Sequence, residues 1–129
     1  MVEITPLYGA LTAILMAILS TRAGLMRGKY KIALGDGGNK ELALNIRRFG
    51  NLSEYAAMVI VLMLLMELNG ASAKMLHTYG SIFIALRLIH PIVLFSDMPP
   101  PKWKMLGRFI SAGGTAILMV FGAFILLSA

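Results

Sequence analysis

The sequence of 129 residues contains no cysteine. Disulfide bonds, thiolate metal sites and a cysteine nucleophile are therefore excluded, and any thiol chemistry must take its sulfur from a substrate. Charge is also scarce, because 14% of the residues are charged whereas a soluble domain carries about 25%. Since 58% of the residues are hydrophobic, a soluble chain of this length would have more apolar side chains than its core could hold. The composition predicts a membrane protein.

Long apolar segments divide the chain into four predicted membrane spans. A bilayer core of about 30 Å requires about 20 apolar residues in a helix. The segments that meet this requirement are residues 4–21, 42–69, 75–95 and 105–128. We therefore expect an all-α, integral membrane four-helix bundle that forms a single domain, residues 1–129. The first span lacks the basic start and the small-residue cleavage site of a signal peptide, so we expect it to be retained.

The basic residues are unevenly distributed among the connections. Most of the twelve Lys and Arg residues lie in or beside residues 22–41 and 96–104, whereas Lys74 alone marks the opposite side. The positive-inside rule then places both basic connections in the cytoplasm and both termini outside. Because membrane topology accounts for the net charge of +6, the sequence gives no reason to expect a nucleic-acid partner.

The second predicted span begins with polar residues that are unusual inside a membrane. Arg47, Asn51 and Glu54 fall on one face of a helix, with Arg48 and Tyr55 on the adjoining flank. Charged groups at this depth are costly and are usually kept for function. This face is therefore a candidate functional site.

Further polar side chains are predicted in the same half of the membrane. Arg22 closes the first span, Arg108 opens the fourth, and Arg87 and His90 share one face of the third. Together with the second span, this gives an excess of arginine over a single glutamate, Glu54. Arginine is suited to bidentate binding of carboxylates. The excess of cations indicates a site for an anionic ligand.

A structural role for these charges is the alternative. Arg47 and Arg48 would then extend to lipid headgroups, while Glu54 would pair with Arg47 or Arg87 to hold helices together. A small four-helix transporter with Glu54 as its coupling site is a further alternative, which the surrounding arginines do not favour. No metal site is expected, because the two histidines are far apart in the sequence. The segment GDGGNK, residues 35–40, is interpreted as a turn rather than a phosphate loop.

The motif R-x-x-x-N-x-x-E-Y, residues 47–55, resembles the second-helix signature of the membrane-associated proteins in eicosanoid and glutathione metabolism (MAPEG). The segment LGDGGNKEL before it and R-x-x-H, residues 87–90, are similar to the bacterial branch of this family. The resemblance covers nearly the whole chain. It implies homotrimers of four-helix subunits that bind glutathione between neighbouring subunits, here in a bacterial inner membrane. The family includes microsomal glutathione transferases, leukotriene C synthase, a prostaglandin E synthase and a non-catalytic lipid-binding member.

The resemblance also implies roles for particular residues. The expected glutathione-binding residues are Arg22, Arg47, Arg48, Asn51, Glu54, Tyr55, Arg87 and His90. The family has a catalytic arginine near the start of the fourth helix, and Arg108 is expected to fill this role by stabilising the glutathione thiolate. Lys102 and Lys104 are the other cations of this region.

The function implied is that of a membrane-bound glutathione transferase or peroxidase. Its co-substrates would be lipophilic electrophiles or hydroperoxides, which reach the site from the membrane lipid. The absence of cysteine fits this expectation, because the nucleophile is the thiol of glutathione. A non-catalytic lipid-binding or scaffold protein of the same fold is the alternative.

Overall fold

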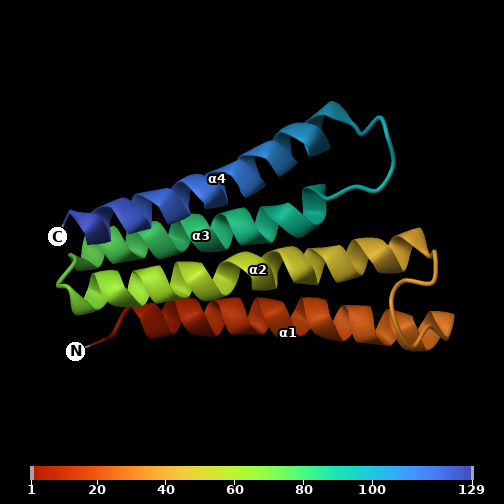
Figure 1. Ribbon diagram of the computed structural model, residues 1–129, viewed down its shortest axis with the longest axis horizontal. Helices are drawn as coiled ribbons and strands as arrows, with labels where there is room; N and C mark the ends of the chain where they lie inside the picture. Colours follow the sequence, from red (N-terminus) through yellow and green to blue (C-terminus); the bar gives the residue numbers. More distant parts are fainter. Residues whose placement is uncertain (1, 129) are drawn as a thin grey trace.

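The computed structural model describes residues 2–128 and contains four long helices joined by three connections (Figure 1). Their bounds are Thr5–Tyr30 (α1), Lys40–Leu68 (α2), Ala73–Val93 (α3) and Lys102–Leu127 (α4). Each helix is long and apolar enough to cross a membrane. The predicted all-α four-helix fold is confirmed.

The helix ends differ from the predicted spans mainly on the basic side. Helix α1 continues beyond residue 21 to Tyr30 and ends where Lys31 adopts a left-handed conformation, with φ of 55°. Arg22 therefore lies within α1 and not at its end. At the start of α4, Lys102 and Lys104 belong to the first helical turn and not to the connection. Hydropathy marks only the apolar part of a helix, so polar turns beyond it are missed.

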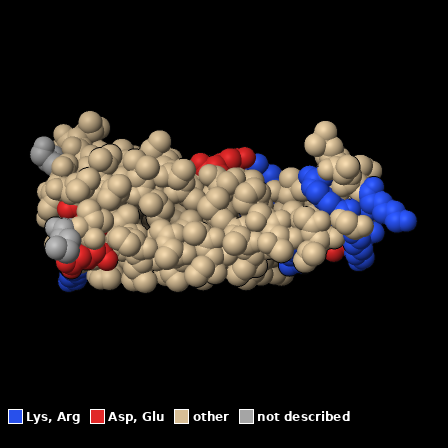
Figure 2. Space-filling model, turned by 90° about the horizontal axis from the view of Figure 1, so that it is seen from below, with Lys and Arg blue, Asp and Glu red and all other residues tan. Residues whose placement is uncertain are grey.

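The two ends of the bundle differ in charge. The α1–α2 and α3–α4 connections lie at one end, whereas the α2–α3 connection, the start of α1 and the end of α4 lie at the other (Figure 1). Lys and Arg side chains gather at the first end (Figure 2), which is here termed the basic end. The prediction that both basic connections share one side is thus confirmed. The positive-inside rule predicts that this side faces the cytoplasm.

Helices α2 and α3 form the inner pair of the bundle. Their buried side chains make up most of the core and include Val59, Met63, Met66, Leu76, Tyr79 and Phe83. Helix α1 packs closely on α3 at Gly80, where an added Cβ would lie 2.5 Å from the ring of Tyr8. Helices α1 and α4 expose large apolar side chains, among them Ile14, Ile18, Ile117 and Val120. Such faces are suited to contact with lipid.

Polar contacts at the end opposite the basic end join the start of α1 to its neighbours. The Glu67 carboxylate of α2 accepts hydrogen bonds from the amides of Glu3, Ile4 and Thr5, at 2.7, 2.7 and 2.8 Å. Helix α1 has no side-chain cap of its own, so Glu67 supplies the acceptor that its first amides need. The Tyr8 hydroxyl donates to the His77 carbonyl of α3 at 3.0 Å. These contacts hold α1 against the inner pair at the end opposite the basic end.

Candidate functional site

A groove of about 260 Å³ at the basic end brings together cations from separate helices. Arg47 of α2 and Arg108 of α4 line it together with Lys40 at the start of α2, and residues 94–96 complete its wall. It is here termed the basic groove. The sequence-predicted Arg47 and Arg108 therefore share one surface, which Lys40 makes still more positive.

An ion pair closes one edge of the basic groove. The Lys40 ammonium lies 3.1 Å from the carboxylate of Asp97, so it links the start of α2 to the α3–α4 connection. The hydrogen bond that Lys40 donates, and its charge, lower the pKa of Asp97 below its ordinary value. Both side chains are largely exposed, so the pair orients the connection more than it stabilises the fold.

Arg47 is paired within its own helix. Its guanidinium donates to both carboxylate oxygens of Glu54, at 2.7 and 3.1 Å. The two side chains are about half exposed, 55% and 52%. The structural alternative requires an ion pair that holds two helices together. The Arg47–Glu54 pair cannot do this, because both residues lie on α2. A half-exposed pair contributes little to stability and can open for a ligand that carries both charges.

Arg87 lies in a different place, inside the bundle. Its side chain is 2% exposed, and its guanidinium donates to Asn51 Oδ1 of α2 at 2.7 Å. On α4 it donates to the Ser111 carbonyl and the Thr115 hydroxyl, both at 2.6 Å. The guanidinium also lies over the ring of Tyr55, 5.7 Å from its centre. Arg87 thus joins α2, α3 and α4 through a buried polar cluster.

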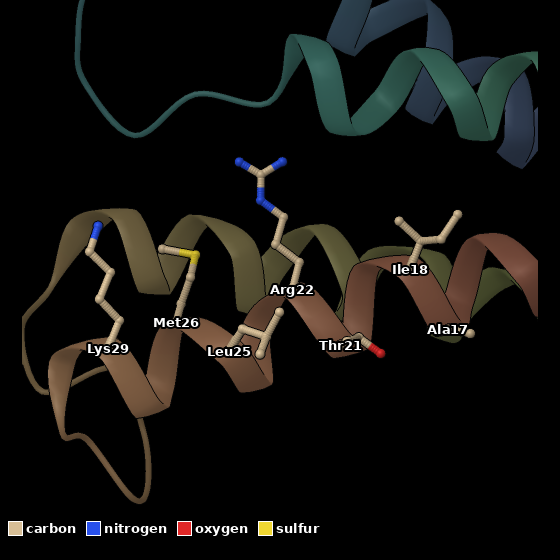
Figure 3. Close-up of a pocket in the computed structure, with 7 residues that line it drawn as sticks. All are labelled: Ala17, Ile18, Thr21, Arg22, Leu25, Met26 and Lys29. Carbon is tan, nitrogen blue, oxygen red and sulfur yellow. The ribbon is translucent and has the colours of Figure 1, made fainter.

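The remaining predicted ligands lie outside the basic groove. Arg48 donates to the Pro91 carbonyl at 2.8 Å, near the C-terminal end of α3, where a cation is favourable. His90 is buried on α3. Arg22 lines a separate hollow of about 580 Å³ beside α1, together with Lys29 (Figure 3). Within one chain, the predicted cluster is thus divided among the basic groove, the bundle interior and the α1 hollow.

The α1 hollow contains Arg22 of α1, whereas Arg108 in the basic groove belongs to α4, and these two helices do not pack together. No Cα of α1 lies within 8 Å of one of α4 among the described residues, whereas each of these helices packs on α2 and α3. In Figure 3 the Arg22 and Lys29 side chains extend to the same side of α1, with Ile18 and Met26 beside them. Within one chain, Arg22 and Arg108 therefore lie on helices that do not pack together.

Several polar groups at these sites are not among the residues predicted from the sequence. Lys40 and Ser96 line the basic groove, and Ser111 and Thr115 hold Arg87. The last two are four residues apart in an apolar span, so they share one helix face, and small hydroxyl residues on such a face often bond to a neighbouring helix. This spacing is the sequence pattern that indicates a contact with a neighbouring helix. The groove depends on the path of the α3–α4 connection, which periodicity does not describe.

Comparison with known proteins agrees with this architecture. The chain matches the MAPEG family over residues 5–124, from the first helix into the last. It is 44% identical over 87 residues to the inner membrane protein YecN of Escherichia coli, both in strain K12 and in an O6:H1 strain. The match covers 67% of this chain but 66% of the relative, slightly less than two thirds of its length. No solved structure matches the chain. Four membrane-spanning helices and a family match over nearly their whole length show that the chain is an integral membrane protein of the MAPEG family.

Proposed function

We propose that the chain is a membrane-bound, glutathione-dependent transferase or peroxidase. Membership of the MAPEG family supports the proposal, because the catalytic members of this family use glutathione as a co-substrate. The observation that carries the proposal is the basic groove, where Arg47, Lys40 and Arg108 come together from separate parts of the chain. Glutathione carries two carboxylates and one ammonium, so it suits a site with more cations than anions.

The Arg47–Glu54 pair is suited to exchange with glutathione. One ligand carboxylate would replace Glu54 at Arg47, and the ligand ammonium would replace Arg47 at Glu54, so both charges stay paired. The exchange costs little because the pair is half exposed. Asn51 lies between the two residues along α2, and Tyr55 follows Glu54 directly.

Arg108 is the proposed catalytic residue. A thiol with a reference pKa of about 8.5 is mostly protonated at neutral pH, and lowering that pKa by about 2 units requires about 2.7 kcal/mol of thiolate stabilisation. A guanidinium beside the thiolate can supply this where the membrane or a neighbouring subunit excludes water. The groove places Arg108 on the same surface as Arg47, so one glutathione molecule can contact both.

The thiolate supports two reactions. With an electrophile it forms an S–C bond and expels the leaving group with its electron pair. With a lipid hydroperoxide it attacks the O–O bond, and protonation releases the alcohol. The glutathione sulfenic acid formed in this step then reacts with a second glutathione to give the disulfide and water. Both co-substrates are lipophilic and would arrive from the bilayer.

Calorimetry of the detergent-solubilised protein with glutathione tests the proposed ligand. Turnover with a hydrophobic aryl halide and with a lipid hydroperoxide tests the two activities. Binding together with turnover of either co-substrate supports the enzyme. Binding of glutathione without thiolate absorbance or turnover would contradict catalysis alone, and absence of glutathione binding would favour the lipid-binding or scaffold protein.

Arg47→Ala should weaken glutathione binding by about 2 kcal/mol, or about 30-fold, because a charged contact to a ligand carboxylate is lost. The thermal stability should change little, since the partner Glu54 is half exposed and on the same helix. Calorimetry and thermal unfolding in detergent measure the two effects. Lys74→Ala removes an equal charge at the opposite end and is the control. A large loss of stability in Arg47→Ala would support the structural alternative instead.

A homotrimer is the assembly that we propose, with one site between each pair of neighbours. The separation of Arg22 from the basic groove supports it, because α1 of one copy can complete a groove formed by α4 of the next. An interface between subunits also has more room for glutathione and a lipophilic co-substrate than a single bundle has. Mass measurement in mild detergent tests the number of subunits.

Mixed trimers provide a sharper test of a shared site. We expect Arg22→Ala and Arg108→Ala homotrimers each to be nearly inactive, and their co-expression to restore part of the turnover. In mixed trimers an intact Arg22 from one subunit meets an intact Arg108 from the next. If both residues served a site within one chain, no intact site would form and turnover would stay absent. Two copies of the same variant, expressed with different tags, are the control.

A further inference from the structure

Arg87 is a buried cation whose hydrogen-bond partners are all neutral. Its acceptors are the Asn51 side chain, the Ser111 carbonyl and the Thr115 hydroxyl, and its Nε has no partner among the described residues. A buried charge without a counter-ion is costly, and an apolar side chain of similar volume is often as good or better for stability. Stability alone therefore does not explain an arginine at this position.

Arg87 is also too deeply buried to bind a ligand directly. Its side chain is 2% exposed, and both terminal nitrogens already donate to other residues. A ligand could reach the guanidinium only if α2, α3 and α4 separated. The sequence-based expectation that Arg87 itself contacts glutathione does not fit this position. Any effect of Arg87 on a ligand has to pass through the groups that it contacts.

The contact with Arg87 fixes the orientation of the Asn51 amide. A guanidinium can only donate hydrogen bonds, so it holds the amide oxygen, and the amide nitrogen with its two donors points elsewhere. That nitrogen makes no hydrogen bond to a described residue and is not a fully buried atom. Asn51 follows Arg47 by one turn of α2 and precedes Glu54 by another. Its free donors thus lie next to the proposed contacts of glutathione.

We propose that Arg87 is a positioning residue, which orients Asn51 so that its amide nitrogen donates to a carboxylate of the ligand. Arg47 and Asn51 would then bind acceptor groups of glutathione, and Glu54 would bind the ammonium. An unconstrained amide could turn its oxygen to the ligand and repel the same carboxylate. This inference rests on the proposed glutathione site. It adds which chemical group of glutathione each of these residues would bind.

Asn51→Asp in the assembled, detergent-solubilised protein tests the proposal. The new carboxylate keeps the acceptor for Arg87 and gives it a counter-ion, so thermal stability should be equal to the wild type or higher. It has no donors for a ligand, so glutathione affinity should fall at least tenfold. Asn45→Asp is the matched control, because Asn45 on the same helix accepts from Arg48 in the same way, at 3.2 Å. Its affinity should stay within about threefold of the wild type.

Amide analogues of glutathione supply the complementary test. If Asn51 faces a ligand carboxylate, the Asn51→Asp protein should bind glutathione amidated at that carboxylate at least threefold more tightly than glutathione itself. The analogue amidated at the other carboxylate should show no such gain. An Asn51→Asp protein with unchanged glutathione affinity, or with no preference for either analogue, would overturn the proposal.

Variants of Arg87 test the orienting step without adding a negative charge. Arg87→Lys keeps a group that only donates, so glutathione affinity should stay within about threefold. Arg87→Gln can donate or accept, so the amide is no longer fixed and affinity should fall at least fivefold. Equal affinities in the two variants would contradict a positioning role, even if Asn51→Asp failed to assemble. Absence of glutathione binding by the wild-type protein would overturn the proposed function, and the proposed role of Arg87 with it.

Discussion

Replacing Arg108 by alanine should lower turnover at pH 7 about 25-fold while it changes glutathione affinity less than about fivefold. The first number follows from the thiolate, since a return of the thiol pKa from about 6.5 to about 8.5 reduces the ionised fraction at pH 7 about 25-fold. The second follows from the other proposed contacts, because Arg47 and Glu54 would bind charged groups of glutathione and not its sulfur. An interaction made mainly with the activated thiolate acts on the chemical step and little on binding.

The environment of Arg108 favours this role. Its side chain lines the basic groove, and its guanidinium lies over the ring of Phe95, 5.1 Å from the centre. The ring fixes the position of the charge and also excludes water from one side of it. By contrast, Lys104 lies over the ring of Trp103, and neither Lys102 nor Lys104 lines the groove.

Thiolate absorbance and turnover, measured together on each variant, decide between these cations. Arg108→Ala should lose both signals, and Arg108→Lys should keep a part of each, since a positive charge remains. Lys102→Ala and Lys104→Ala are the controls and should resemble the wild type. Normal thiolate absorbance in Arg108→Ala, with its loss in either lysine variant, would transfer the role to that lysine.

The fold could be predicted from the sequence because the bilayer imposes a single requirement. A helix that crosses the membrane needs a long apolar segment, and the chain has four of them. The predicted helix bounds are wrong where a helix extends beyond its apolar segment. Residues 22–30 are helical but basic, and Lys102 and Lys104 begin a helix that is not yet apolar. Hydropathy does not detect such turns.

The candidate site could be predicted only in part, for a geometric reason. Helical periodicity correctly places Arg47 and Glu54 on one face of α2, where they form an ion pair. Periodicity gives angles between residues but not the direction of the bundle interior. Asn51 is on the same broad face, yet it turns inward to Arg87, whereas Arg47 and Glu54 remain exposed. Which side of a polar face is buried depends on packing against α3 and α4.

Arg87→Ala should destabilise the bundle by about 3–5 kcal/mol, the largest effect on stability that we expect from a single residue of the candidate site. The change removes a large buried side chain and leaves a cavity among α2, α3 and α4. It also leaves three buried acceptors, on Asn51, Ser111 and Thr115, with one partner fewer. Thermal and denaturant unfolding in detergent measure the loss.

A comparison with Arg87→Met separates volume from charge in this result. Methionine fills much of the same space and brings no buried charge, and such replacements are often neutral or stabilising. We therefore expect Arg87→Met to be far more stable than Arg87→Ala, while its glutathione affinity falls because Asn51 is no longer oriented. If Arg87→Ala were as stable as the wild type, the hydrogen bonds of the guanidinium would not stabilise the packing of α2, α3 and α4. If Arg87→Met kept full glutathione affinity, the arginine would serve packing alone.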